Sequence, residues 1–224
     1  MSLSLACSLD RTGFPIIALP GLPFRISWLP VTKIQFEHFL VDQGTLDNDW
    51  YQDKLTNYNP RVSPSQLSNT NYWQAFLTGM LPDEALLYAR WLGEGADLPT
   101  SAEWKSVLTA LRFPADSAYV DTVLNLPGLN PRAHQLMQNL DRVLPGEYSQ
   151  LTEGHFLFDQ MAMRLGVLEL LFDDYQRLSY CCWGQVNRRF ANGGNNPLSD
   201  LTPLRFTQRT GVRMNTLGFR LIFR

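Results

Sequence analysis

The stretch LPTSAEW at residues 98–104 predicts the start of a helix. Thr100 and Glu103 have the T-x-x-E spacing of a capping box, in which each side chain accepts a hydrogen bond from the backbone N–H of the other residue. Pro99 lies just outside the helix, where the N–H that proline lacks is not needed. Apolar residues then recur at helical spacing, so one stripe is expected to face the core: Trp104, Val107, Leu108 and Leu111.

A second capping box lies upstream, where Thr32 and Gln35 have the T-x-x-Q spacing. It predicts a helix that ends at Gly44, because glycine readily adopts the left-handed conformation found just past a helix end. The helix is expected to bury three apolar side chains, those of Phe36, Phe39 and Leu40.

Two further helices are expected, over residues 82–95 and 130–146. The first has proline at its entry, acids in its first turn and glycine at its exit, and the second is bounded by Pro131 and by Pro145 with Gly146. One face of the first helix is apolar: Ala85, Tyr88, Ala89 and Leu92. Several shorter stretches are typical of strands, namely 24–28, 166–172, 178–183 and 217–223.

The composition indicates a folded chain that can bury a substantial core. It has 224 residues, of which 45% are hydrophobic and 18% are charged, and a single domain over residues 1–224 is expected. Three cysteines are too few for a disulfide framework in a chain of this length, which favours a reducing cytoplasm as its location. No apolar run approaches the roughly 20 residues that cross a bilayer, so no membrane span is expected.

Positive charge is concentrated near the C-terminus, although the formal net charge of the chain is −2. This pattern has two interpretations. The arginines could pair with acidic neighbours inside the fold, or they could form a surface for an anionic or carboxylate-bearing partner. From Tyr180 onward the charged residues are Arg188, Arg189, Asp200, Arg205, Arg209, Arg213, Arg220 and Arg224.

Four stretches resemble the formylglycine-generating-enzyme-like (sulfatase-modifying-factor) family and occur in its order. They are PVTKIQFEHFL (30–40), DEALLYARWLG (83–93), LPTSAEWKSVL (98–108) and LGFRLIFR (217–224). Residues 166–175, GVLELLFDDY, resemble the GNVWEW segment of the family with leucines in place of both tryptophans. YCCWG (180–184) takes the place of the RGGSW strand.

The resemblance implies an α+β chain with a C-type-lectin-like fold, in which two main helices pack against small twisted antiparallel sheets with long irregular loops. Residues 114–153 match the family poorly and are interpreted as a lineage-specific insert. Glu169 and Arg220 fall where the family has WEW and the terminal GFR. We therefore expect them to form a buried charge pair with a structural role.

Catalysis does not follow from the fold. Oxidase members of the family have two cysteines shortly before the final GFR, where sulfur ligands bind copper(I), but residues 197–208 of this chain contain none. Cys181 and Cys182 lie earlier and are adjacent. Adjacent strand residues point to opposite faces, so they are expected to be structural. A modifying oxidase that uses Cys181 or Cys182 as a thiolate is kept as the alternative.

Other cofactor patterns are absent from the sequence. His38, His134 and His155 do not have the H-x3-H-x-E spacing of iron-binding relatives, and the calcium motifs of sugar-binding lectins do not occur. We therefore expect no catalytic residue, no metal site and no cofactor, while a structural calcium ion in a loop stays open.

What remains is a C-terminal stretch rich in residues typical of binding surfaces. Its place between an RGGSW-like strand and a terminal GFR is similar to that of the diversified region in variable proteins of diversity-generating retroelements. We expect a non-catalytic protein that binds a protein or small ligand, and the acidic chain with few lysines argues against nucleic acid. The expected ligand-binding residues are Trp183, Gln185, Asn187, Arg189, Phe190, Asn192, Arg205, Thr207, Gln208, Arg209, Arg213 and Asn215.

Overall fold

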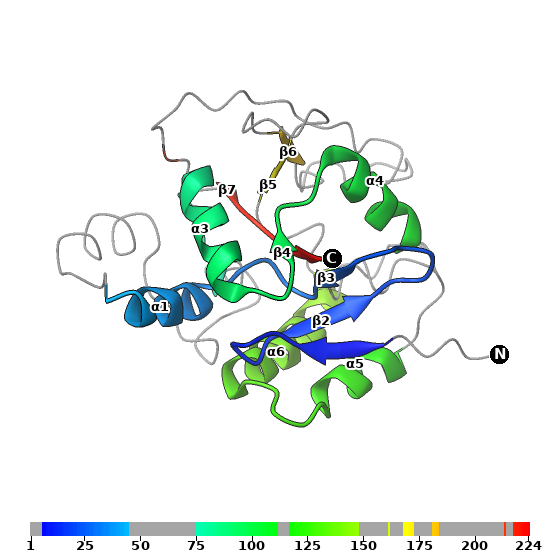
Figure 1. The fold of residues 1–224 in the computed structure, drawn as a ribbon. Helices are drawn as coiled ribbons and strands as arrows, with labels where there is room; N and C mark the ends of the chain where they lie inside the picture. The colour runs from blue at the N-terminus through cyan, green and yellow to red at the C-terminus, as the bar shows by residue number, and fades with distance from the viewer. Residues whose placement is uncertain are drawn as a thin grey trace.

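The computed structural model contains helices and strands arranged around two small sheets (Figure 1). None of its helices, within the part of the chain that is described, is long and apolar enough to cross a membrane. The residues that the structure describes are 6–44, 75–111, 117–147, 161, 168–172, 181–183, 213 and 217–224.

The larger sheet has five strands in the order β1-β2-β3-β8-β4, and every neighbouring pair is antiparallel. The C-terminal strand β8 therefore lies between β3 and β4, which come from the first half of the chain. The bounds are β1 (Cys7–Leu9), β2 (Pro15–Ala18), β3 (Arg25–Ser27), β4 (Ala96–Asp97) and β8 (Ile222–Phe223). Sequence analysis predicted β3 and missed the β1–β2 hairpin and β4. It expected a single strand over 217–223, whereas the structure has two short strands there, at 217–218 and 222–223, in different sheets.

The smaller sheet has the order β6-β5-β7. Its central strand β5 (Leu168–Leu171) pairs antiparallel with β6 (Cys181–Trp183) and parallel with β7 (Leu217–Gly218). The expectation that the sheets are antiparallel is therefore correct for the large sheet and wrong for the β5–β7 pair. A parallel pair needs a long connection between its strands, and here β6 and the residues after it supply one.

Two helices begin at the predicted capping boxes. In α1 (Lys33–Asp42) the backbone N–H of Thr32 donates to Gln35 Oε1 at 2.9 Å, and that of Gln35 donates back to Thr32 Oγ1 at 3.3 Å. In α4 (Ser101–Ala110) the reciprocal bonds between Thr100 and Glu103 measure 2.8 and 3.2 Å. Both predictions are confirmed, because a capping box needs only residues three positions apart.

The other helices are α3 (Pro82–Leu92), α5 (Ser117–Leu124) and α6 (Pro131–Glu147). The apolar face predicted for α3 is buried. Sequence analysis missed α5, and α6 continues through Pro145 to Glu147, past its predicted end. Both α5 and α6 fall within residues 114–153, the stretch interpreted as an insert. They contribute buried side chains to the apolar core that also contains Trp28 and Trp104, among them Val123, Leu136 and Leu140.

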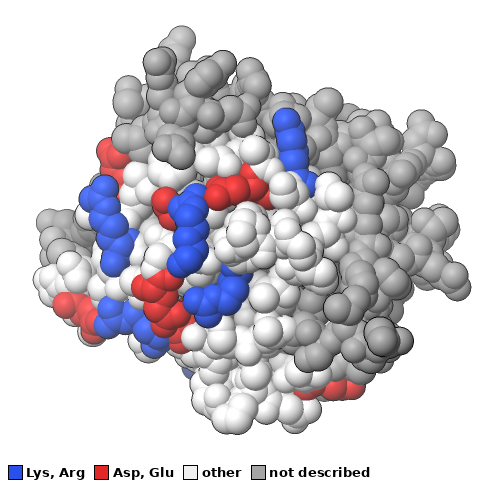
Figure 2. Space-filling model, turned by 45° about the vertical axis from the view of Figure 1, so that its right-hand side comes forward, with Lys and Arg blue, Asp and Glu red and all other residues white. Residues whose placement is uncertain are grey.

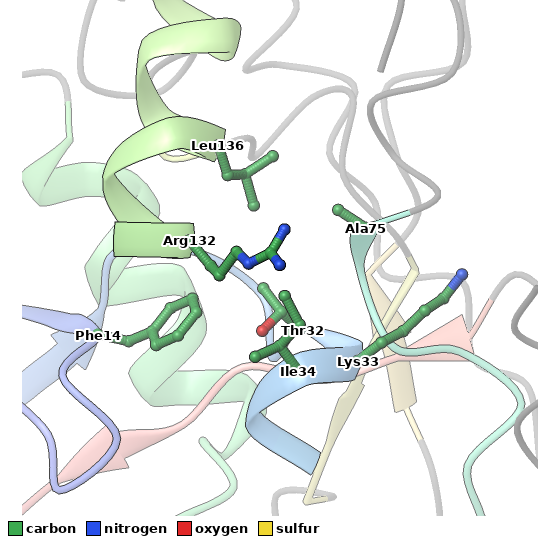
Figure 3. A pocket seen from close by; sticks show the side chains of 7 residues that line it. All are labelled: Phe14, Thr32, Lys33, Ile34, Ala75, Arg132 and Leu136. Carbon is green, nitrogen blue, oxygen red and sulfur yellow. The ribbon is translucent and has the colours of Figure 1, made fainter. Parts of the chain in front are cut away.

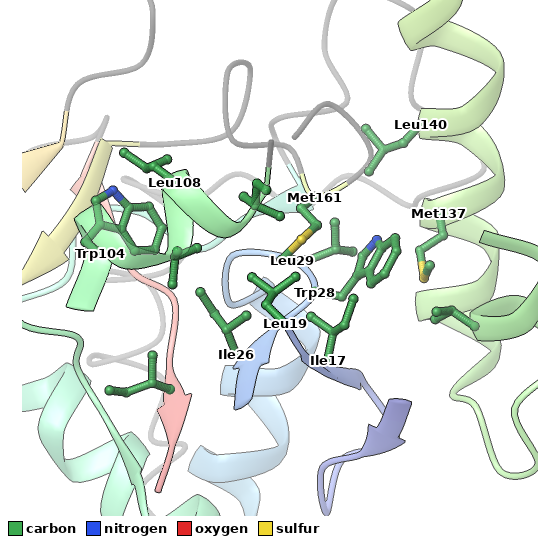
Figure 4. Packing of buried hydrophobic residues seen from close by; sticks show 14 of the residues in the cluster. Ile17, Leu19, Ile26, Trp28, Leu29, Trp104, Leu108, Met137, Leu140 and Met161 are labelled. Carbon is green, nitrogen blue, oxygen red and sulfur yellow. The ribbon is translucent and has the colours of Figure 1, made fainter. Parts of the chain in front are cut away.

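The larger sheet separates two apolar cores. Alternate strand residues point to opposite faces, so Ile17, Ile26 and Ile222 join the core covered by α4, α5 and α6, which also contains Trp28 and Trp104 (Figure 4). Ile16 and Phe223 join the second core, under α1 and α3. That core contains an aromatic cluster made of Phe36, Phe39, Tyr88, Trp91 and Phe219.

Charged side chains of both signs alternate over one face of the molecule (Figure 2). Several are paired: Arg11 with Asp42 at 3.3 Å, and Arg224 with Asp97 at 2.8 Å and with Glu103 at 2.9 Å. The C-terminal residue thus binds two acids from the first half of the chain. The interpretation that C-terminal arginines pair with acids inside the fold is correct for Arg224, and it also holds for Arg213 and Arg220.

Candidate functional site

Two of the twelve predicted ligand-binding residues lie within the described part of the chain. Trp183 is the last residue of β6, where the structure describes the backbone, and Arg213 is described with its side chain. The other ten lie outside the described residues: Gln185, Asn187, Arg189, Phe190, Asn192, Arg205, Thr207, Gln208, Arg209 and Asn215. The structure does describe the two strands that flank this stretch, β6 before it and β7 after it, and these strands are called its supports below.

The two supports lie at the same end of the smaller sheet. In the register of β5, Trp183 at the end of β6 pairs with Glu169, and Leu217 at the start of β7 pairs with Leu168. Because β6 runs antiparallel and β7 runs parallel to β5, residues 184–216 leave and return at the N-terminal end of β5. Two strand spacings separate these points, which is roughly 10 Å.

An ion pair between Glu169 and Arg220 holds β5 against the chain that follows β7. Arg220 Nε donates to Glu169 Oε2 at 3.2 Å and Nη2 donates to Oε1 at 3.1 Å. The remaining Arg220 hydrogens bind backbone oxygens of Ser27, Trp28 and Met161. The expected buried charge pair is therefore present.

Burial and charge act in opposite directions on this pair. Burial raises the pKa of Glu169, and the charge and hydrogen bonds of Arg220 pull it back toward its ordinary value. With its oxygens held by the guanidinium, Glu169 is suited to a structural role. A buried pair of this kind fixes geometry more than it adds stability.

Arg213 binds the start of α3. Its Nη1 and Nη2 donate to the two carboxylate oxygens of Glu84 at 2.7 and 2.6 Å, and Nη1 also donates to the carbonyl oxygen of Gly79 at 2.8 Å. The Gly79 N–H donates to the carbonyl oxygen of Leu217 at 3.0 Å. The side chain of Arg213 is 10% exposed. These contacts are internal, so they fix the chain just before β7.

Sequence analysis did not identify Glu84 as a partner of this region. Glu84 also accepts a hydrogen bond from the backbone N–H of Leu81 at 2.9 Å, which caps α3. An acid at the third position of a helix is adequately explained by capping, so nothing in the local sequence indicated a second partner. The long-range pairing depends on the fold.

The cysteines of the alternative hypothesis lie on β6. Their backbones pair with β5, Cys182 opposite Leu170 and Cys181 opposite Leu171. Leu170 belongs to the core under α1 and α3, and Leu171 to the core under α4, α5 and α6. Within the described residues, no group of three or more His, Cys, Asp and Glu residues is placed to hold a metal ion.

Comparison with known proteins gives one match. The family model described as the Sulfatase-modifying factor enzyme 1-like domain matches residues 17–224, which is most of the chain. No curated protein and no solved structure matches this chain.

Proposed function

Because the chain belongs to the Sulfatase-modifying factor enzyme 1-like domain family, we propose that it is a non-catalytic binding protein with a C-type-lectin-like fold. The proposed ligand surface is carried by Trp183 and the connection between β6 and β7, residues 184–216, apart from Arg213, whose side chain binds Glu84. A family model that spans residues 17–224 supports treating the chain as one domain. The ligand is a protein or a small molecule.

The observation that supports this proposal most strongly is the register of the smaller sheet. It brings both ends of residues 184–216 to one end of β5. A connection whose ends are held side by side can change its side chains without changing the supports, because the supports draw their stability from the cores and from the pairs Glu169–Arg220 and Glu84–Arg213. Binding residues in many folds lie on loops held by a rigid scaffold in this way.

The composition of the connection supports binding over catalysis. It contains asparagine, glutamine, threonine, phenylalanine and arginine, and it lacks cysteine and histidine. Amide and guanidinium groups donate directional hydrogen bonds, and aromatic rings provide contact area at low entropic cost. Specificity would then depend on which side chains the connection carries.

The test is an alanine variant of six polar residues of the connection: Gln185, Asn187, Asn192, Thr207, Gln208 and Asn215. We expect its melting temperature to fall by less than about 10 °C, since six surface substitutions that each change stability by about 0.5 kcal/mol or less sum to at most about 3 kcal/mol. We also expect its binding profile on peptide and glycan arrays to change. A loss of more than about 10 °C would place these residues in the structural framework and contradict the proposal.

We further propose that a retroelement diversifies these residues. The support is the layout: a strand at residues 181–183, a polar connection, and the terminal LGFR at residues 217–220. The flanking DNA tests this. An imperfect copy of the codons for residues 183–216 that differs mainly at adenines, beside a reverse transcriptase gene, is the expected finding, and its absence would leave an ordinary, undiversified binding protein.

The enzymatic alternative has its own test. A copper-dependent oxidase that uses Cys181 or Cys182 would take up copper(I) and consume oxygen with a cysteine-bearing peptide. Cys182→Ser would abolish both if this cysteine acted as the thiolate, and Cys7→Ser serves as the control because Cys7 lies on β1, in the other sheet. Our proposal predicts no turnover in any of these proteins.

A further inference from the structure

Glu84, in the first turn of α3, holds the chain that enters β7. Its Oε1 accepts a hydrogen bond from Arg213 Nη2 at 2.6 Å, and its Oε2 accepts one from Arg213 Nη1 at 2.7 Å. Oε2 also accepts the backbone N–H of Leu81 at 2.9 Å. The Glu84 side chain is 18% exposed. One largely buried carboxylate therefore caps a helix and also holds a residue 129 positions further along the chain.

Arg213 and Leu217 are both bound to Gly79. Arg213 Nη1 donates to the carbonyl oxygen of Gly79 at 2.8 Å, and the Gly79 N–H donates to the carbonyl oxygen of Leu217 at 3.0 Å. Leu217 in turn pairs with Leu168 of β5. The entry to β7 is therefore fixed at two points, and Asn215, one of the expected ligand-binding residues, lies between them in the sequence.

The two ends of the connection between β6 and β7 are held by different kinds of contact. Trp183 ends β6, a strand that is paired through its backbone with β5. The entry to β7 depends in addition on a side-chain pair, in which each Nη atom of Arg213 bonds to one Glu84 oxygen. A bidentate pair restricts orientation as well as distance. Replacing Glu84 should therefore alter one end of the connection and leave the other in place.

We propose that Glu84 is a positioning residue for the ligand surface and that it acts through Arg213. The proposal rests on the function proposed above, in which residues 184–216 carry that surface. By orienting Arg213, Glu84 sets the direction in which the connection meets β7, and with it the placement of Asn215. Ligands that contact this end of the connection should lose affinity when Glu84 is changed, whereas ligands that contact other parts should not.

Charged side chains from distant segments also line the pocket between the first turns of α1 and α6 (Figure 3). There the Lys33 side chain runs past Ala75, away from the Arg132 guanidinium. These two groups do not converge on a common point, so we assign the pocket no ligand. Glu84 and Arg213 do converge, and their contacts bear directly on the proposed surface.

The start of α4 provides a matched control. Glu103 has the same position in its helix as Glu84, and it binds an arginine from the C-terminal part of the chain, Arg224, at 2.9 Å. Arg224 follows β8 and does not belong to the connection between β6 and β7. Glutamine keeps a capping oxygen and removes the charge. Glu84→Gln and Glu103→Gln therefore make the same chemical change at the two places.

The experiment starts from peptide and glycan arrays bound by the full chain. The strongest-binding array compounds are the probes, and their dissociation constants are measured for the unchanged protein and for both variants. Glu84→Gln should weaken at least one probe by about fivefold or more, which corresponds to about 1 kcal/mol, and should change the ratios between probes. A smaller folded fraction would scale all apparent constants equally, so the ratios report on positioning. Glu103→Gln should leave the ratios unchanged.

Arg213→Lys tests whether geometry is required in addition to charge. Lysine keeps the positive charge but cannot bond to both Glu84 oxygens in parallel, so this variant should change the ratios as Glu84→Gln does. Unchanged ratios in both variants, or the same change in Glu103→Gln, would overturn the positioning role and leave the binding function intact. Absence of saturable binding by the unchanged protein would overturn the binding function, and the positioning role with it.

Hydrogen exchange of the free proteins gives a second readout that needs no ligand. The N–H of Gly79, which donates to Leu217, should exchange at least about fivefold faster in Glu84→Gln, a local loss of about 1 kcal/mol. The N–H of Val31, which donates to the carbonyl oxygen of Phe219 at 2.9 Å, lies further from the pair along the C-terminal chain and should accelerate less. Equal acceleration at both groups would mean that Glu84 contributes only to overall stability, which contradicts the proposal.

Discussion

Arg220 and Glu169 form an ion pair enclosed by protein on all sides, with Nη2 and Oε1 3.1 Å apart. The two side chains are 0% and 4% exposed. Arg220 also donates to the carbonyl oxygens of Ser27, Trp28 and Met161. One guanidinium therefore joins the smaller sheet, the C-terminal end of β3 with the residue that follows it, and residue 161.

Arg220→Met should lower the free energy of unfolding by about 3–5 kcal/mol, because it leaves the Glu169 carboxylate buried without its cation. The double variant Arg220→Met/Glu169→Leu removes both charges and should be less destabilised than Arg220→Met alone. Urea unfolding measures both. Arg224→Met, at an exposed pair, should cost less than about 1 kcal/mol. Equal losses at Arg220 and Arg224 would contradict the structural role of the buried pair.

Tyr88→Phe should raise the free energy of unfolding by about 1 kcal/mol. The Tyr88 hydroxyl is buried and makes no hydrogen bond with any described residue, and removing an unsatisfied polar group removes its desolvation penalty. Burial, together with the charge of Asp10, raises the pKa of Tyr88. Tyr119→Phe, at a half-buried tyrosine, is the control and should bring no gain. A loss of stability in Tyr88→Phe would mean that the hydroxyl has a partner.

Gly95→Ala should destabilise the protein by about 2–4 kcal/mol. Gly95 has φ +70°, and a Cβ atom there would lie 2.5 Å from the carbonyl oxygen of Arg224, so strain from positive φ adds to a backbone collision. Gly44→Ala separates the two effects, because Gly44 has φ +62° and a Cβ atom there would meet no atom of the described residues within 4 Å. It should cost about 1 kcal/mol. Thermal unfolding measures the loss of stability in both variants. Equal losses would mean that Arg224 moves away from the new Cβ atom and that no backbone collision occurs.

Glu84→Gln and Arg213→Met should each cost about 1–3 kcal/mol, the usual loss for charge-assisted hydrogen bonds. A double-mutant cycle between them should give a coupling energy of about 1 kcal/mol or more, because the residues share two short contacts. Chemical denaturation measures the coupling energy. A coupling energy of zero would contradict a structural role for the Glu84–Arg213 pair, and Arg213 would again be assigned to the proposed ligand surface.

Stability should rise with pH between about 8 and 10.5 through Lys33. The pKa of Lys33 is about 8 in the folded chain and 10.5 in a model chain. Between these values the unfolded chain holds a proton that the folded chain has lost, so the free energy of unfolding increases with pH. Below about pH 8 the penalty is fully present. Lys33→Met should remove this increase when urea unfolding is compared at pH 7.5 and 10, and an unchanged slope would show that other groups cause it.

Much of the local structure follows from the sequence. The capping boxes at Thr32 and Thr100 predict the starts of α1 and α4 correctly, and the apolar face of α3 is buried as its spacing indicates. The expected pair of Glu169 with Arg220 is also present, although it came from the family resemblance. The expected ligand-binding residues other than Trp183 and Arg213 lie outside the described residues. A role in ligand binding stays a prediction for them and for Trp183, of which the structure describes only the backbone.

Sequence alone could determine helices whose signals span three to eleven residues, because caps and apolar stripes act between near neighbours. Tertiary structure decided which distant residues meet: β8 between β3 and β4, and Arg213 on Glu84. A lysine at the start of a helix has no local reason to be buried, and an arginine near the C-terminus has many acids within its reach. Only the packing of the whole chain, which removes specific surfaces from water, selects one partner for each.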